Sequence, residues 1–191
     1  EAGRGPLAGP VYAAAVAVDL GRLDDDWLVD LDDSKKLERV DREAAFEAIR
    51  ADAPAWCIEH SDHEVIDRIN ILQATLRAME RAVEGVCRAL SGEPDHVFID
   101  GNASIRTNLP QRTIVGGDAR SLSIAAASIL AKVERDSIMR EHHEQWPEYN
   151  FASNKGYPTG EHRRTIASRG PCPIHRRSFG GVSEHVDDSS D

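Results

Sequence analysis

Apolar residues form short continuous runs in some stretches and recur at helical spacing in others, which predicts strands intermixed with helices. The stretch 10–18 (PVYAAAVAV) is small, apolar and bounded by turn residues, which predicts a buried strand. Residues 71–90 carry large apolar side chains at steps of three or four, which predicts an amphipathic helix with one buried face. Strands and helices mixed in this way favour an α/β layered domain.

The remaining elements are shorter or less regular. Apolar runs predict further strands, and imperfect helical periods predict further helices. The expected strands are 55–60, 97–101 and 113–115, and the expected helices are 36–50, 64–70, 121–146 and 161–168. An acidic loop is expected at 21–33 and a loop containing Gly and Pro at 149–160.

Two aspartates stand where an apolar run gives way to glycine. Asp100 ends the run 97–100, and Asp118 follows Gly116 and Gly117 after the next run. Ligands of open α/β sheets bind at strand ends, and carboxylates are the hard oxygen ligands that Mg²⁺ prefers. An Asp beside Gly is also a common turn residue. The pair alone therefore leaves a metal site and two turns as open interpretations.

The first ten residues, EAGRGPLAGP, combine Glu1 with small and turn-forming residues and with one basic residue, Arg4. Such a segment favours close approach of a ligand to the backbone. A plain glycine-rich turn is the alternative.

Composition sets the size and class of the protein. The chain has 191 residues, of which 40 % are hydrophobic, enough for one domain with a single core. No apolar run approaches the ~20 residues that span a membrane. The cysteines, Cys57, Cys87 and Cys172, are odd in number and scattered, which favours buried thiols over a disulfide framework or a metal motif.

The net charge of -10 counts against nucleic-acid binding, but the charges are segregated. Acidic residues concentrate in 24–33 and 184–191, whereas arginines gather in 163–177. Adaptation to a salt-rich cytoplasm and ordinary drift are both open explanations of the acidity.

Taken together, these segments resemble ribonuclease HII, the type 2 ribonuclease H. The first ten residues match its N-terminal signature, and the other motifs follow in the family's order and spacing. They are Asp33-Ser34-Lys35-Lys36-Leu37, Ile71-Leu72-Gln73-Ala74-Thr75, Ile99-Asp100-Gly101-Asn102, Gly117-Asp118, Ala125-Ala126-Ala127-Ser128-Ile129-Leu130-Ala131-Lys132-Val133, Lys155-Gly156-Tyr157-Pro158-Thr159 and His175-Arg176-Arg177-Ser178-Phe179.

The resemblance covers residues 1–182 and implies an α/β fold, a ribonuclease H-like mixed five-stranded sheet flanked by helices, with the first strand truncated. Residues 183–191 are expected to form an acidic, disordered tail. The family signature has an Asp before its Glu, so a fourth catalytic carboxylate is expected immediately before Glu1.

The implied activity is hydrolysis of the phosphodiester at ribonucleotides in RNA/DNA hybrids or embedded in duplex DNA, leaving 5′-phosphate and 3′-hydroxyl ends. Glu1, Asp100 and Asp118 would be catalytic and would bind two Mg²⁺ or Mn²⁺ ions. The resemblance also implies a cytoplasmic monomer that acts in ribonucleotide excision repair and has no membrane partner.

Substrate recognition is expected in two parts. Gly3, Arg4 and Gly5 would lie beside the ribose 2′-hydroxyl, which distinguishes RNA from DNA, while Tyr157 stacks on the adjoining deoxyribose. Phosphate contacts are expected from Lys36, Lys155 and Arg177, with Arg176 on the same basic face. The family often has His where this chain has Asn154, and Asp136 is expected to form an ion pair with Arg135 or Arg140 rather than to act as a catalytic acid.

Two other functions stay open. One is a non-catalytic module that binds RNA/DNA hybrids, because the Asp before Glu1 is absent. The other is a related metal nuclease such as a junction resolvase. The pairing of Gly3-Arg4-Gly5 with Tyr157 counts against the resolvase, because these residues serve 2′-hydroxyl sensing in the resemblance.

Overall fold

The computed structural model describes residues 1–23, 28, 31 and 38–186. The predicted order of strands and helices is confirmed, with shifts of a few residues at their ends. The elements are β1 (Val11–Ala17), η1 (Leu20–Arg22), α2 (Arg39–Asp52), β2 (Ala55–Ser61), α3 (His63–Ile69), α4 (Ile71–Ala89), β3 (Val97–Asp100), β4 (Gln111–Ile114), η2 (Gly117–Ala119), α5 (Leu122–Gln145), η3 (Pro147–Tyr149), α6 (Phe151–Asn154), α7 (Gly160–Arg169) and η4 (Ser183–His185).

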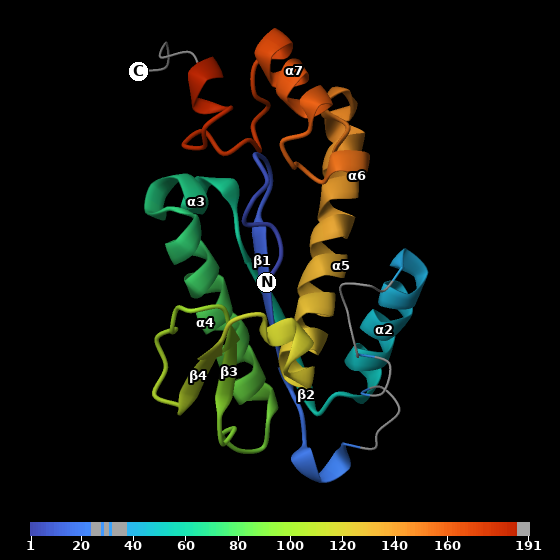
Figure 1. The fold of residues 1–191 in the computed structure, drawn as a ribbon, viewed down its shortest axis with the longest axis vertical. Helices are drawn as coiled ribbons and strands as arrows, with labels where there is room; N and C mark the ends of the chain where they lie inside the picture. Colours follow the sequence, from blue (N-terminus) through green and yellow to red (C-terminus); the bar gives the residue numbers. More distant parts are fainter. Residues whose placement is uncertain (24–27, 29–30, 32–37, 187–191) are drawn as a thin grey trace.

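The centre of the molecule is a two-stranded antiparallel ribbon, β1–β2. Its register runs from Val11 opposite Ser61 to Ala17 opposite Ala55. Helices α4 and α5 both pack against β1, and α2 packs against α5 (Figure 1). The small side chains of β1 let these helices approach closely, and the first three residues of the strand and Val16 are buried.

A second sheet is formed by β3 and β4, which pair in parallel with Asp100 opposite Ile114. The described strands thus make two two-stranded sheets, one antiparallel and one parallel. This mixed pairing agrees with the predicted fold class, but the expected single five-stranded sheet is present only as these two pairs.

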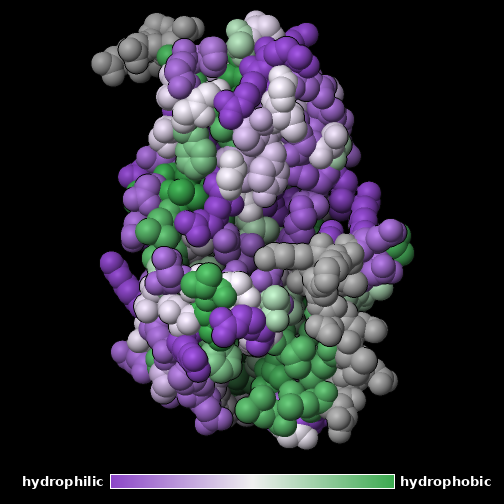
Figure 2. Space-filling model, viewed as in Figure 1, coloured by the Kyte–Doolittle hydropathy of each residue, from purple (hydrophilic) through white to green (hydrophobic). Residues whose placement is uncertain are grey.

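A large groove is lined by residues of both sheets. Its volume is about 1230 Å³, and its lining includes Ala14 and Val16 of β1 and Ile99 of β3. Figure 2 shows apolar surface at the lower end of this face, where Figure 1 places η1; Leu20 and Leu23 also line the groove and are exposed.

The buried face of α4 differs from the prediction. The buried positions are mainly the small residues Ala74, Thr75, Ala78 and Ala82, together with Val86 of the predicted apolar stripe. The large residues Leu76, Met79 and Val83 are only partly buried against the β3 cluster, and Leu72 is 39 % exposed. The reason is the close contact of α4 with the ribbon, which admits small side chains and turns the large ones aside.

Two main cores stabilise the two ends of the fold. One joins β1, α2 and the first half of α5, and the other joins the end of α5 to α6, α7 and the C-terminal segment. The second core contains Leu7, Ala8, Met139, Tyr149, Phe151, Ile166, Cys172, Ile174 and Val182. It anchors the N-terminal loop beside the C-terminal segment, as Figure 1 shows at the upper end.

Several expectations fall at the edges of the described chain. The loop expected at 149–160 contains the short helix α6, and the first residues of the expected tail form η4. Lys36, most of the acidic loop and residues 187–191 lie outside the described residues. No helix in the described part of the chain is long and apolar enough to cross a membrane.

Candidate active site

Asp100 and Asp118 are brought together by the ends of β3 and β4. The backbone N–H of Gly117 donates a hydrogen bond of 2.9 Å to Oδ1 of Asp100. Asp118 follows directly and is buried, with 8 % of its surface exposed. A Cβ on Gly117 would lie only 2.5 Å from Ile124 Cδ1 and 3.3 Å from Asp100 Oδ1. The glycine therefore lets the two strand ends approach, and the aspartates become neighbours.

Glu1 lies beside β1 and lines the same groove as Asp100. Its position follows from the antiparallel bridge between Ala2 and Tyr12, whose two backbone hydrogen bonds are both 2.9 Å long. The Arg4 guanidinium lies 4.0 Å from the Glu1 carboxylate. In the described residues, no group of three or more His, Cys, Asp or Glu side chains is close enough to hold a metal ion. The shared metal site of Glu1, Asp100 and Asp118 thus stays a prediction.

The two segments predicted to sense the sugar meet in space, although about 150 residues separate them. A Cβ on Gly5 would lie 3.5 Å from Cε1 of Tyr157. Both residues are exposed, and the Tyr157 ring is open to solvent on one side. The backbone N–H of Leu7 donates to the Gly156 carbonyl at 2.8 Å. Gly5 and the Tyr157 ring therefore form adjoining parts of one exposed surface, and sugar sensing by this surface stays a prediction.

The predicted basic face is only partly present. Arg177 is exposed, but Arg176 is fully buried, with 0 % exposure. The Arg176 guanidinium donates only to backbone carbonyls of the N-terminal loop. The prediction for Arg176 is therefore wrong, because its fully buried guanidinium binds the inside of a loop and cannot reach a phosphate.

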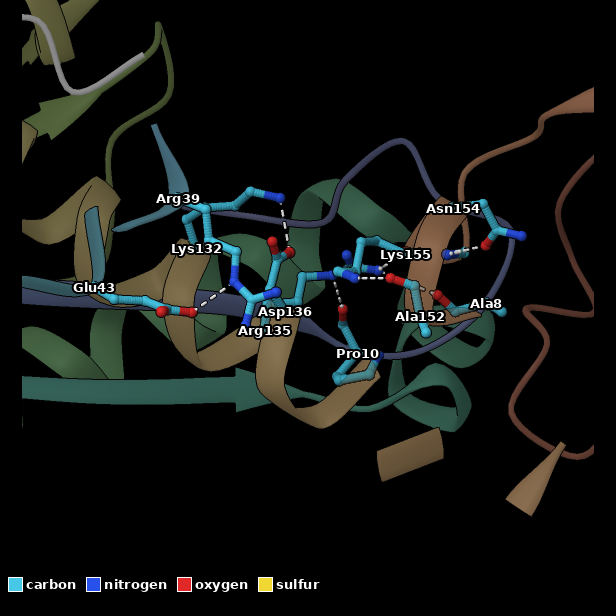
Figure 3. Close-up of polar contacts among 11 residues, drawn as sticks. Ala8, Pro10, Arg39, Glu43, Lys132, Arg135, Asp136, Ala152, Asn154 and Lys155 are labelled. Carbon is cyan, nitrogen blue, oxygen red and sulfur yellow. Dashed lines mark hydrogen bonds and ion pairs between the residues drawn. The ribbon is translucent and has the colours of Figure 1, made fainter. Parts of the chain in front are cut away.

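Lys155 and Asn154 hold the turn before Tyr157. Lys155 has a left-handed backbone, with φ of 52°, and its Nζ donates to the Ala152 carbonyl (Figure 3). Burial lowers the pKa of Lys155. The Asn154 amide donates to the Tyr149 carbonyl, and its oxygen accepts from Gly156 N, both at 2.7 Å. Asn154 is thus a structural residue of this turn.

Asp136 forms the ion pair that was expected, but with a different partner. Lys132 Nζ donates to Asp136 Oδ1 at 2.7 Å, one helical turn away on α5 (Figure 3). The i, i+4 spacing places the two side chains on one face of the helix. The sequence neighbour Arg135 points elsewhere, toward Pro10.

A buried histidine relay, missed by the sequence reading, supports the Tyr157 turn. The Cys172 N–H donates to His175 Nδ1 at 3.0 Å, and the Nε2 atoms of His175 and His162 are 3.0 Å apart. His162 Nδ1 lies 2.8 Å from the Tyr157 carbonyl. Because His175 Nδ1 accepts, its Nε2–H donates to His162, whose Nδ1–H then donates to Tyr157. Both rings must be neutral for this chain of bonds.

The relay makes the fold sensitive to acid. Burial, and next the neighbouring His162, lower the pKa of His175 from 6.5 to about 4, and burial lowers the pKa of His162. The unfolded chain therefore binds more protons between these pH values, so stability is complete above pH 6.5 and falls as the pH drops toward 4. We expect about 2 kcal/mol of unfolding free energy to be lost between pH 7.5 and 5.

Urea unfolding at the two pH values measures this loss. His175→Gln keeps a donor for His162 Nε2 but does not titrate, so its loss between pH 7.5 and 5 should be much smaller. A variant that loses as much as the wild type would assign the acid sensitivity to other groups.

Comparison with known proteins places this arrangement in a class. The structure of ribonuclease H2 from Pyrococcus horikoshii OT3 superposes with a TM-score of 0.75 at 23 % identity, over 96 % of this chain and 92 % of that one. The structure of the PCNA:RNase HII complex from Archaeoglobus fulgidus matches with a TM-score of 0.71 at 26 % identity, over 92 % and 90 %. Bst-RNase HIII in complex with Mn²⁺ matches with a TM-score of 0.70 at 18 % identity, over 96 % and 66 %. The fold is that of the ribonuclease H-like nucleases.

The sequence comparisons are more specific. The family model for Ribonuclease HII matches residues 1–182. Ribonuclease HII of Geobacter metallireducens is 54 % identical over 186 residues, which cover 97 % of this chain and 84 % of the relative. Ribonuclease HII of Chlorobium luteolum is 52 % identical over 181 residues, which cover 94 % and 85 %. The chain belongs to the ribonuclease HII family, a family of endonucleases.

Proposed function

We propose that this chain hydrolyses the phosphodiester at ribonucleotides in RNA/DNA hybrids or embedded in duplex DNA, with the help of two divalent cations. The observation that carries the proposal is the Gly117 N–H···Asp100 hydrogen bond of 2.9 Å, because it holds two acidic residues at adjacent strand ends. Glu1 and Asp100 line the same groove between the two sheets.

The residues suit magnesium or manganese. Asp100, Asp118 and Glu1 offer only carboxylate oxygens, the hard ligands that these cations prefer. When bound, two such ions supply an activated water and stabilise the leaving 3′-oxygen. The Gly117 N–H orients the Asp100 carboxylate. Cleavage leaves a 5′-phosphate and a 3′-hydroxyl. A relative of the same fold, Bst-RNase HIII, has been solved with Mn²⁺, which supports this metal class.

Recognition of the sugar belongs to the two segments that meet at Gly5 and Tyr157. The backbone of Gly3, Arg4 and Gly5 would lie beside the ribose and its 2′-hydroxyl, with Gly5 exposed and without a side chain to block the approach. The half-exposed Tyr157 ring stacks on the deoxyribose that follows. Phosphate contacts come from Arg177, Lys155 and Lys36, the last of which lies outside the described residues. We further propose a cytoplasmic monomer acting in ribonucleotide excision repair.

The direct test restores the carboxylate that the family signature has before Glu1. If the ladder Ala2–Tyr12 continues, Glu1 pairs with Ala13 and the preceding residue with Ala14, which lines the groove. The chain extended by Asp should cut an RNA/DNA hybrid in Mg²⁺ or Mn²⁺ and lose this activity in EDTA. The matched chain extended by Asn should bind the hybrid without cutting it.

The main alternative predicts a different result for the same pair. A non-catalytic binding module would bind the hybrid equally in both forms and cut it in neither. That outcome, with either metal, would overturn the proposed nuclease activity of this chain.

A further inference from the structure

Two arginines are completely buried behind the proposed sugar-sensing segments. Arg135 on α5 is 1 % exposed, and Arg176 is 0 % exposed. In the part of the chain that the structure describes, neither forms an ion pair with a carboxylate. Burial of a charge is costly unless hydrogen bonds compensate it. Here backbone carbonyls provide that compensation, and they come from the segments that sense the sugar.

Arg176 gathers the N-terminal loop around its guanidinium. Nη2 donates to the Gly3 carbonyl at 2.6 Å, and Nη1 donates to the carbonyls of Arg4 and Pro6 at 3.1 and 2.8 Å. Nε donates to the Gly9 carbonyl at 2.9 Å. These bonds turn four carbonyls of the loop inward and fix its path.

Arg135 joins this loop to the turn that carries Tyr157. Its Nε donates to the Pro10 carbonyl at 3.0 Å, and Nη2 donates to the carbonyls of Ala8 at 3.3 Å and Lys155 at 3.0 Å (Figure 3). A Cβ on Gly3, whose φ is +99°, would lie 2.1 Å from Arg135 Nε. The guanidinium therefore packs directly under the glycine and bridges both segments.

The N-terminal loop and the turn that carries Tyr157 also pack closely against each other. A Cβ on Gly156, whose φ is +82°, would lie 2.7 Å from the Ala8 carbonyl oxygen. On the outer side, Gly5 faces the Tyr157 ring. A movement of either segment would leave a buried guanidinium with an unmatched donor, so the carbonyl contacts resist changes in the gap between Gly5 and Tyr157.

We propose that Arg135 and Arg176 are positioning residues for ribose discrimination, which set the gap between Gly5 and Tyr157 from beneath. This inference rests on the proposed function, because it assigns the device that makes the same site selective. Neither arginine touches the nucleic acid. The ligand class that the surface formed by Gly5 and Tyr157 selects is a duplex with a 2′-hydroxyl at the site.

Binding of two duplexes measures this role in the full chain. Fluorescence anisotropy gives the affinity for a DNA duplex with one ribonucleotide and for the all-DNA duplex of the same sequence. Arg135→Lys and Arg176→Lys keep the charge but lose the planar fork. We expect each to lower the preference for the ribonucleotide about tenfold, the loss of about one hydrogen bond to the 2′-hydroxyl. Affinity for the all-DNA duplex should change less than about twofold.

The all-DNA duplex separates positioning from folding, because a misfolded variant loses affinity for both duplexes. Arg88→Lys, an exposed position on α4, is the matched control and should keep the wild-type preference. Gly156→Ala leaves both guanidiniums in place and pushes the segments apart. It should also lower the preference, and it decides the question if the arginine variants do not fold.

The possible failures are distinct. A wild-type chain without preference for the ribonucleotide overturns the proposed sugar sensing, and this inference with it. A wild-type preference that persists unchanged in folded Arg135→Lys and Arg176→Lys, or in Gly156→Ala when those two do not fold, overturns the positioning role and leaves the proposed function intact.

Discussion

Asp100→Asn, in the chain extended by Asp before Glu1, should lower hybrid cleavage by at least about a hundredfold, a size typical of lost electrostatic stabilisation at a reacting phosphate or acyl group. The asparagine oxygen can still accept the Gly117 N–H that Asp100 Oδ1 accepts at 2.9 Å. The local shape is thus retained while the negative charge that binds the cation is removed. The affinity of this variant for the hybrid should stay within about twofold of the affinity of the chain that keeps Asp100.

Single-turnover cleavage and anisotropy on the same hybrid measure the two quantities. Asp52→Asn, at the exposed end of α2, removes one carboxylate away from the groove and should leave both unchanged. Wild-type cleavage by Asp100→Asn would show that Asp100 is only a turn residue.

The second large effect concerns the substrate. If Gly5 and Tyr157 hold a ribose next to a deoxyribose, a DNA duplex with one embedded ribonucleotide should be cut, and the all-DNA duplex should stay intact. Tyr157→Ala should slow cleavage, because it removes roughly 1–3 kcal/mol of stacking free energy from substrate binding. Tyr157→Phe keeps the ring beside Gly5 and should lose much less.

Gel analysis of both duplexes after equal incubation tests this selectivity. Equal cutting of the two would refute 2′-hydroxyl sensing, whatever the effect of Tyr157→Ala. Equal rates for Tyr157→Ala and Tyr157→Phe would instead remove stacking as the contribution of this residue.

Local sequence patterns predicted the elements and the candidate carboxylates. The apolar run before Asp100 and the glycines before Asp118 mark strand ends, because a buried strand is apolar and its end must turn. The structure adds the Gly117 N–H that ties these ends together. The order of the motifs predicted the family, which the comparisons confirm.

The structural supports of the site were missed. His162, His175, Arg135 and the buried role of Arg176 carry no local signal, because His and Arg are polar residues that usually lie on the surface. The motif His175-Arg176-Arg177 marked this segment as important, but it did not show that His175 and Arg176 are buried while Arg177 is exposed. The unusual density of Gly and Pro at 3–10 was the available sign that many carbonyls there needed donors.

The sequence by itself determined which segments become strands and helices, since hydrophobic period and turn residues act over a few neighbouring positions. Only the tertiary structure decided that small rather than large residues of α4 face the ribbon and that Arg176 lies inside while Arg177 lies outside. It also decided that Gly5 meets Tyr157. These outcomes depend on contacts between distant segments, where burial, close approach and the need to satisfy every buried polar group outweigh the preference of any single residue.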